Sequence, residues 1–265
     1  MPEPIRVIVS GSGKMGRAIV EAVDAADGMT PVGVLEKFAE APALVLPSGL
    51  DVPMTADEDD AFDEWDGDVV IDFTNASWTP TVVDAALRRG VRPVIGTSGL
   101  SEAFVASLAG RCREQRLGGV VAANFAIGAV LLMHMAKTAA RFFDAAEIIE
   151  LHHDQKVDAP SGTAIATARG MASARGRPFA RNVPTSETIA GARAAAIDGV
   201  TLHSVRLPGL VAHQEVIFGG LGQTLTLRHD STGRDSFMPG IVLAAREVMG
   251  RQELVVGLDA LIGLA

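Results

Sequence analysis

Residues 147–163 hold the side chains of this sequence that are best placed to do chemistry together. An apolar run ends in His152 and His153, a loop carrying Lys156 follows, and Pro160-Ser161-Gly162-Thr163 then opens a helix. A histidine can donate a proton near neutral pH, and a lysine supplies a fixed positive charge. The N–H groups at the start of a helix have no partner within the helix and can hold a carboxylate. The stretch therefore predicts a site that binds a carboxylated substrate and protonates it.

Taken one at a time, these residues have ordinary structural explanations. A single histidine is most often a structural imidazole, and Lys156 alone would be a surface lysine. His152 and His153 are adjacent on an expected strand, so their side chains point to opposite faces, which counts against a shared metal ion. No convincing third ligand lies nearby, and Cys112, the only cysteine, is remote and is expected to pack in the interior. We therefore expect no metal, and only the combination of residues favours chemistry.

A second group of residues, near the N-terminus, predicts a dinucleotide site. Gly11-Ser12-Gly13-Lys14-Met15-Gly16 has the form G-x-G-x-x-G between an expected strand at 5–9 and an expected helix at 14–26. Such glycines let the backbone approach a pyrophosphate at the helix start. Glu36 follows about 20 residues later, where an acid binds a ribose hydroxyl. Lys37 beside it could attract a 2′-phosphate or be a solvated lysine, so we expect both NADH and NADPH, with the preference open.

Loops after later strands are expected to border the same ligand crevice, because the carboxyl ends of parallel strands meet at one edge of the sheet. The residues in these loops are Phe73 and Thr74, then Gly96, Thr97 and Ser98, and finally Ala122, Ala123, Asn124 and Phe125.

The elements that must position these residues alternate in type through the first half of the chain. Strands are expected at 5–9, 32–35, 68–73, 91–95 and 119–123, with helices at 14–26, at 79–89 and after residue 101. Alternation of this kind is typical of a doubly wound parallel sheet. Residues 39–67 are expected to be irregular.

The pattern changes in the second half. A helix near 127–142 and a strand at 147–152 precede the helix that starts near Ser161, and 175–198 are expected to be rich in loops. Strands then follow closely at 200–206, 211–218 and 223–229, before a helix at 237–249. We expect an α/β protein with a Rossmann-type domain at 1–124 and 237–265, and an α+β domain with a mixed, largely open sheet at 125–236.

The overall charge restricts the classes of partner. The chain has 23 Lys and Arg against 32 Asp and Glu, a net charge of −9 without a dense basic run. It is therefore a poor binder of nucleic acid or anionic membranes. Neither a secretion signal nor a membrane span is expected, and a lone cysteine suits the cytoplasm.

Residues 150–164 closely resemble a motif of the dihydrodipicolinate reductase family. Glu150-Leu151-His152-His153-Asp154-Gln155-Lys156-Val157-Asp158-Ala159-Pro160-Ser161-Gly162-Thr163-Ala164 is similar to its pattern E-x-H-H-x-x-K-x-D-A-P-S-G-T-A. Similarity continues, in order, through 69–74, 96–99, 123–128 and 203–215. One departure is Ser10, which stands where the family more often has the first glycine of G-x-x-G-x-x-G.

The resemblance implies reduction of the product of dihydrodipicolinate synthase with NADH or NADPH, on the diaminopimelate route to lysine. His152 then matches the proton donor or acceptor and Lys156 the second catalytic residue. The dicarboxylate-binding positions would be His153, Lys156, Ser161, Gly162, Thr163 and Thr97. The cofactor contacts would be Ser10 to Met15, Glu36, Lys37, Phe73, Gly96 to Ser98, and Ala122 to Phe125. The family is usually a homotetramer built on the sheet of its second domain.

Three alternatives remain open on the residues alone. Another NAD(P)-dependent imine or amino-acid dehydrogenase would explain the N-terminal half but not the block at 152–163. A dinucleotide-binding regulatory protein without catalysis would not need His152 or Lys156. A metal-dependent hydrolase is a more distant possibility.

Overall fold

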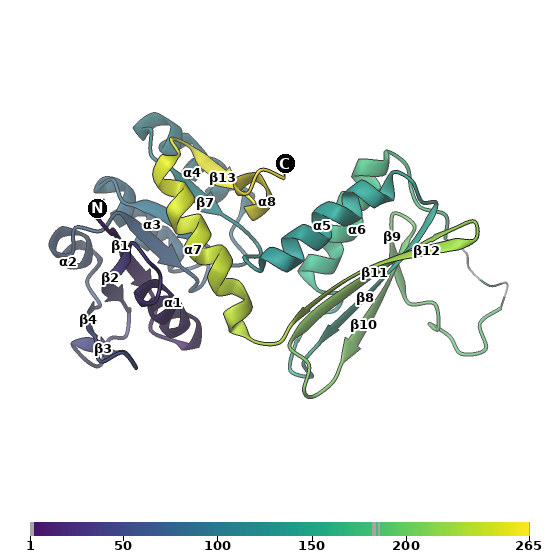
Figure 1. The fold of residues 1–265 in the computed structure, drawn as a ribbon, viewed down its shortest axis with the longest axis horizontal. Helices are drawn as coiled ribbons and strands as arrows, with labels where there is room; N and C mark the ends of the chain where they lie inside the picture. The colour runs from purple at the N-terminus through teal and green to yellow at the C-terminus, as the bar shows by residue number, and fades with distance from the viewer. Residues whose placement is uncertain (1–2, 182–183, 185, 265) are drawn as a thin grey trace. The chain divides into compact units, whose positions relative to one another are not determined.

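The computed structural model describes residues 3–181, 184 and 186–264, which form two compact units (Figure 1). Unit 1 combines the chain up to Phe125 with the segment from Phe237 onward, and unit 2 comprises Ala126–Ser236. The predicted boundaries lay at 124/125 and 236/237. In the part of the chain that the structure describes, no helix is long and apolar enough to cross a membrane.

Unit 1 is built on an eight-stranded sheet in the order β13-β7-β6-β5-β1-β2-β4-β3. All neighbouring strands are parallel except β3 and β4. The order reverses at β1, between β2 and β5, and ligands of doubly wound sheets bind at such a reversal. The strands are β1 (Ile5–Ser10), β2 (Met29–Leu35), β3 (Ala43–Val45), β4 (Asp51–Thr55), β5 (Val69–Asp72), β6 (Arg92–Ile95), β7 (Gly119–Val121) and β13 (Leu254–Val256).

Helices cover both faces of this sheet, so its inner strands are buried and apolar (Figure 1). Ile8 of β1 and Val70 of β5 pack in one core cluster with Phe62 and Val82, which belong to two of these helices. The helices are α1 (Lys14–Asp24), α2 (Glu58–Glu64), α3 (Thr79–Arg88), α4 (Glu102–Gln115), α7 (Met238–Glu247) and α8 (Leu258–Leu261). Short 3₁₀ turns, η1 (Arg234–Phe237) and η2 (Val248–Gly250), flank α7.

The prediction that residues 39–67 are irregular was wrong, because this segment contains β3, β4 and α2. β4 extends the parallel sheet by pairing with β2, and its Pro53 is tolerated beside the short outermost strand. The Asp57 side chain caps α2 by accepting hydrogen bonds from the N–H groups of Asp59 and Asp60. Glu58, Asp59 and Asp60, within the segment expected to be irregular, form the first turn of α2, where negative charge is stabilising.

Unit 2 is a five-stranded mixed sheet in the order β12-β11-β8-β10-β9, with α5 and α6 packed side by side on one face (Figure 1). β8 and β10 are parallel, and the other pairs are antiparallel. The fold class predicted from the sequence is confirmed. The elements are α5 (Ile127–Ala140), β8 (Ala145–His152), α6 (Gly162–Arg175), β9 (Ala195–Ile197), β10 (Val200–Arg206), β11 (Ala212–Gly220) and β12 (Gln223–Ser231).

Alternation along β8 separates the two faces of this sheet. Ala146, Ile148 and Glu150 face the helices and are buried, whereas Glu147 and Ile149 point to the other face and are partly exposed. The buried core includes Phe218 of β11 and Met171 of α6. An acidic side chain thus lies among the apolar residues that face the helices.

Candidate active site

The turn after β1 has the geometry of an anion-binding loop. Gly11 has φ of +93°, a conformation that favours glycine. A Cβ at Gly16 would lie 1.9 Å from the carbonyl oxygen of Gly11, so only glycine allows α1 to approach the turn this closely. Gly13 is the N-cap of α1 without a side-chain cap, and a Cβ there would meet no atom within 4 Å. The first turn of α1 therefore opens onto space that can hold a pyrophosphate.

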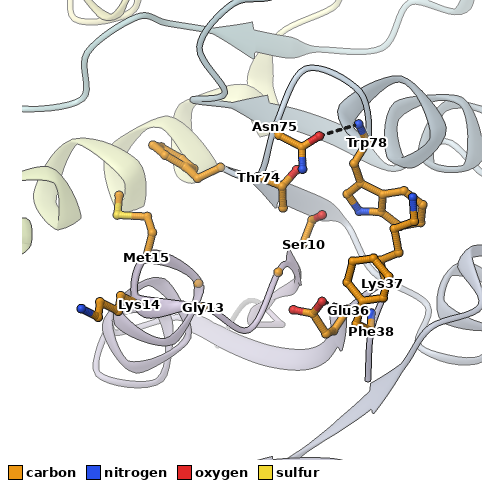
Figure 2. A pocket seen from close by; sticks show the side chains of 13 residues that line it. Ser10, Gly13, Lys14, Met15, Glu36, Lys37, Phe38, Thr74, Asn75 and Trp78 are labelled. Atoms are coloured by element: carbon orange, nitrogen blue, oxygen red, sulfur yellow. Dashed lines mark hydrogen bonds between the residues drawn. The ribbon is translucent and has the colours of Figure 1, made fainter. Parts of the chain in front are cut away.

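A cavity of about 360 Å³ lies beside this turn (Figure 2). Glu36, Lys37, Phe38 and Trp78 lie on one side of it, and Met15 lies on the other. The hydroxyl of Ser10 is buried and has no hydrogen-bond partner among the described residues, which fits a bound polar ligand. The lining residues are Ser10, Gly11, Gly13, Lys14, Met15, Gly16, Glu36, Lys37, Phe38, Phe73, Thr74, Asn75 and Trp78.

Glu36 is held against the glycine turn. Its carboxylate accepts hydrogen bonds from the Ser12 N–H at 2.7 Å, the Ser12 hydroxyl at 2.9 Å and the Phe38 N–H at 3.1 Å. Burial opposes ionisation, but these hydrogen bonds bring the pKa of Glu36 below its usual value of 4.5. Glu36 is therefore an ionised acceptor at the position where a ribose hydroxyl is expected.

Lys37 rests on two aromatic rings. Its Nζ lies 5.2 Å from the Trp78 ring centroid and 5.7 Å from that of Phe38, within the range of cation–π contacts. The sequence analysis singled out neither Phe38 nor Trp78, and Trp78 lies 42 positions beyond Glu36 in the chain. The contacts place a positive charge beside Glu36 instead of leaving it free in solvent.

The loops after β5 and β6 are joined by a buried carboxylate that the sequence analysis missed. Asp72 accepts hydrogen bonds from the hydroxyls of Thr74 at 2.7 Å, Thr97 at 2.9 Å and Thr79. The hydroxyl of Thr97, predicted to bind ligands, is thus engaged with Asp72 in this structure. Its predicted contacts stay predictions.

Aromatic packing connects the other predicted loops of unit 1. A Cβ at Gly96 would lie 2.0 Å from the Phe73 ring, and that ring lies 5.0 Å from the Phe125 ring between centroids. Phe73 and Thr74 line the cavity, whereas the remaining predicted members of these loops do not. Those members are Gly96, Thr97, Ser98, Ala122, Ala123, Asn124 and Phe125.

In unit 2, the central strand β8 ends at His152, whose side chain lies beside that of Glu150. The Nδ1 atom of His152 lies 2.5 Å from a carboxylate oxygen of Glu150, which is fully buried. Burial is the largest influence on His152 and lowers its pKa below 6.5, although Glu150 opposes that effect. Lys156 and Arg206 lower the pKa further by their charge. A proton held on His152 is therefore readily given up.

The start of α6 lies in the same unit and fits an anion. Ser161 caps the helix through its hydroxyl, which accepts a hydrogen bond from the Ala164 N–H at 3.2 Å. Gly162 is exposed, and a Cβ there would meet no atom within 4 Å, so the first turn opens onto space. Lys156 is paired with Asp158 at 2.6 Å, so it must exchange that partner to contact a substrate.

These elements place most of the predicted substrate residues in unit 2. His152, Lys156, Ser161, Gly162 and Thr163 lie between the end of β8 and the first turn of α6. His153 is exposed beyond β8, and Thr97 belongs to unit 1. Within the described ranges, no group of three or more His, Cys, Asp or Glu side chains could hold a metal ion.

A dinucleotide-type turn in unit 1 and a histidine beside an anion-binding helix start in unit 2 define an oxidoreductase of the nicotinamide-dependent class. Two family models match nearly the whole chain: "Dihydrodipicolinate reductase, N-terminus" at residues 5–125 and "Dihydrodipicolinate reductase, C-terminus" at residues 128–262. The chain belongs to the dihydrodipicolinate reductase family, as its central motif predicted.

Relatives agree with this assignment over their full lengths. The 4-hydroxy-tetrahydrodipicolinate reductase of Dehalococcoides mccartyi is 44% identical over 98% of this chain and 99% of its own. That of Geobacillus thermodenitrificans is 46% identical over 96% and 98%. The solved structure of dipicolinate-bound dihydrodipicolinate reductase from Paenisporosarcina sp. TG-14 is 42% identical, with a TM-score of 0.88 over 97% of this chain and 99% of that one. These findings favour the reductase over the three alternatives.

Proposed function

We propose that this chain reduces 4-hydroxy-tetrahydrodipicolinate to tetrahydrodipicolinate with NADH or NADPH, on the diaminopimelate route to lysine. The observation that carries the proposal is the arrangement of His152, Lys156 and the start of α6 in a chain of this family. The chemistry matches, because a dicarboxylate needs an anion site and the reduced ring needs a proton.

Different residues of unit 2 bind the two carboxylates of the substrate and transfer the proton. The first turn of α6, at Gly162 and Thr163, binds one carboxylate through its N–H groups and helix dipole. Lys156 and His153 bind the second carboxylate and orient the ring, and orientation can supply much of the rate. Loss of the 4-hydroxyl group as water leaves an unsaturated ring, and His152 then transfers a proton to that ring as it accepts the hydride.

Unit 1 holds the dinucleotide, which when bound supplies the hydride. Gly11 to Met15 bind the pyrophosphate, and Glu36 exchanges its hydrogen bonds with Ser12 for those of the adenosine ribose. Phe73, Gly96 to Ser98, and Ala122 to Phe125 would supply further cofactor contacts, with Ala122 to Phe125 bordering the nicotinamide. Lys37 supplies positive charge for a 2′-phosphate, which supports use of NADPH as well as NADH.

We also propose a cytoplasmic homotetramer that assembles through the face of the unit 2 sheet that α5 and α6 leave uncovered. This face presents a partly exposed apolar centre of Ile149, Leu151, Val205 and Ile217. Charged pairs such as Arg228 with Asp230 border it. An apolar centre with a polar border is typical of subunit interfaces, and sedimentation of the purified chain tests the assembly.

A coupled assay tests the reaction. Dihydrodipicolinate synthase, pyruvate and aspartate semialdehyde generate the unstable substrate, and absorbance of NADH or NADPH is followed. Oxidation should require both the synthase and this chain, and His152→Gln should lower turnover about 100-fold or more with NADH affinity unchanged. Lys156→Ala should also raise the KM for the substrate. No oxidation by folded protein that binds NADH would refute the proposed substrate.

A further inference from the structure

Glu150 lies at the centre of the candidate site in unit 2, although it is not itself among the residues predicted to bind the substrate. Its carboxylate is fully buried, and both of its oxygens accept hydrogen bonds. One oxygen accepts from His152 Nδ1 at 2.5 Å and Arg206 Nη1 at 2.9 Å. The other accepts from the Ser161 N–H at 3.2 Å and Arg206 Nη2 at 2.8 Å. One carboxylate therefore joins the expected proton donor to the start of the expected anion site.

Arg206 reinforces this connection from the neighbouring strand. Its guanidinium pairs with both oxygens of Glu150, and Nη2 also donates to the carbonyl oxygen of Asp158 at 2.7 Å. Such a two-pronged pair fixes both partners in one orientation. The loop that carries Lys156 is thus tied at its far end, near Asp158, to the same pair.

The arrangement also determines which nitrogen of His152 can exchange the reacting proton. An ionised carboxylate can only accept, so Nδ1 must carry a proton to bond Glu150. When the ring is neutral, Nε2 is then the unprotonated nitrogen that takes up and releases the reacting proton. Without a fixed partner, a neutral histidine would distribute between its two tautomers.

We propose that Glu150 and Arg206 are positioning residues. They fix the tautomer of His152 and hold its side chain in a defined position relative to the start of α6. This inference deepens the proposed function and rests on it. The Glu150 carboxylate thereby fixes both the proton donor and the anion-binding helix start, which must contact the substrate at the same time.

The charges around His152 agree with this assignment. Burial opposes ionisation of Glu150, but hydrogen bonds from Arg206, the Ser204 side chain and His152 bring its pKa below 4.5. Glu150 is therefore ionised across the working pH range. The positive charges that act on His152 come from Arg206 of β10 and from Lys156 of the following loop.

The test follows the side-chain ¹⁵N signals of His152 together with turnover, in the full-length chain. In the wild type above the pKa of His152, we expect Nδ1 to be protonated and Nε2 to be unprotonated. In Glu150→Gln, an NH₂ group toward Ser161 would oppose two donors, the Ser161 N–H and Arg206 Nη2, whereas an NH₂ group toward His152 opposes only Arg206 Nη1, so the second orientation is favoured. The ring should then switch to the Nε2–H tautomer, with kcat lowered about 100-fold and KM changed far less.

Two further variants separate positioning from simple stabilisation. Arg206→Lys keeps a cation beside Glu150 but loses one prong, so the His152 tautomer should persist while the KM for the substrate rises. Asp144→Asn is the matched control, because Asp144 lies in the same unit just before β8 and also pairs with an arginine, Arg177 at 3.1 Å. It should leave the His152 signals and turnover unchanged.

Three results would overturn the inference: an Nε2–H tautomer in the wild type, no change of tautomer in Glu150→Gln, or full turnover by that variant. If the wild type fails to oxidise NADH in the coupled assay, the proposed function falls. The tautomer measurement, which needs no substrate, still decides the role of Glu150 separately.

Discussion

Two alanine substitutions in one glycine turn should have different consequences. At Gly16 a Cβ would lie 1.9 Å from the oxygen and 2.7 Å from the carbon of the Gly11 carbonyl group. Both are backbone atoms, so relief requires that β1 and α1 move apart by more than 1 Å, about the shortfall from van der Waals contact. Overpacking of this kind costs about 3 kcal/mol, and NADH binding should fall with it.

At Gly13 the same methyl group meets no atom within 4 Å, and the residue has an ordinary extended conformation with φ of −68°. The free energy of unfolding should fall by about 1 kcal/mol or less, the difference between glycine and alanine as an N-cap. The methyl group would nevertheless occupy the space expected for the pyrophosphate. NADH affinity should therefore fall about tenfold or more, because a lost phosphate contact costs about 1.4 kcal/mol.

Urea unfolding measures stability, and the fluorescence of bound NADH measures affinity. The wild type and Gly110→Ala, a glycine in α4 with open space around it, serve as references. If Gly13→Ala bound NADH as tightly as the wild type, the pyrophosphate would not lie at this turn. If Gly16→Ala kept full stability, the close approach of Gly11 and Gly16 would not limit the fold.

Three further predictions concern charge. Lys37→Ala should raise the KM for NADPH about tenfold and change that for NADH little, because it removes a partly screened charge worth roughly 1.4 kcal/mol to a 2′-phosphate; paired kinetics with both cofactors would contradict this if the two KM values rose together. The kcat/KM of the reductase should fall as pH rises through the lowered pKa of His152, below 6.5, and this limb should be absent from the pH profile of His152→Gln. Burial lowers the pKa of both His152 and His229 on folding, so the unfolded chain binds more protons below pH 6.5; the free energy of unfolding should decrease from about pH 8 to about pH 5, and a flat profile would contradict it.

The features that could be predicted from the sequence are those in which function and local structure share one short stretch. The segments from Ser10 to Gly16 and from His152 to Thr163 each contain a strand end, a loop and a helix start within about a dozen residues. Their backbone requirements are local, so residue types alone indicate them. The same approach failed for residues 39–67. The position of β4 is specified by its pairing with β2, and short strands with Pro and Asp carry little local signal.

The pairs that hold the site were hidden for a different reason. Glu150 and Arg206 lie 56 positions apart, and Asp72 and Thr97 lie 25 apart, so each pair exists only once the strand register is set. One signal was available: alternation along 147–152 puts Glu150 on the same face as the buried Ile148. A carboxylate at an inward-facing strand position needs a cation or several donors, because an unpaired buried charge is strongly destabilising.

That requirement also explains why the network is placed beside the site and not elsewhere in the core. The β10–β8 register sets Arg206 opposite His152 and Ser204 opposite Glu150. β10, which supplies the cation, therefore ends at the same level as β8, which supplies the proton donor. Moving the register by one residue would turn Arg206 to the uncovered face and leave Glu150 buried without its cation. Burial of Glu150 therefore favours the β10–β8 register that brings Arg206 beside it. With that register, the Glu150 carboxylate holds both His152 and the start of α6 in place.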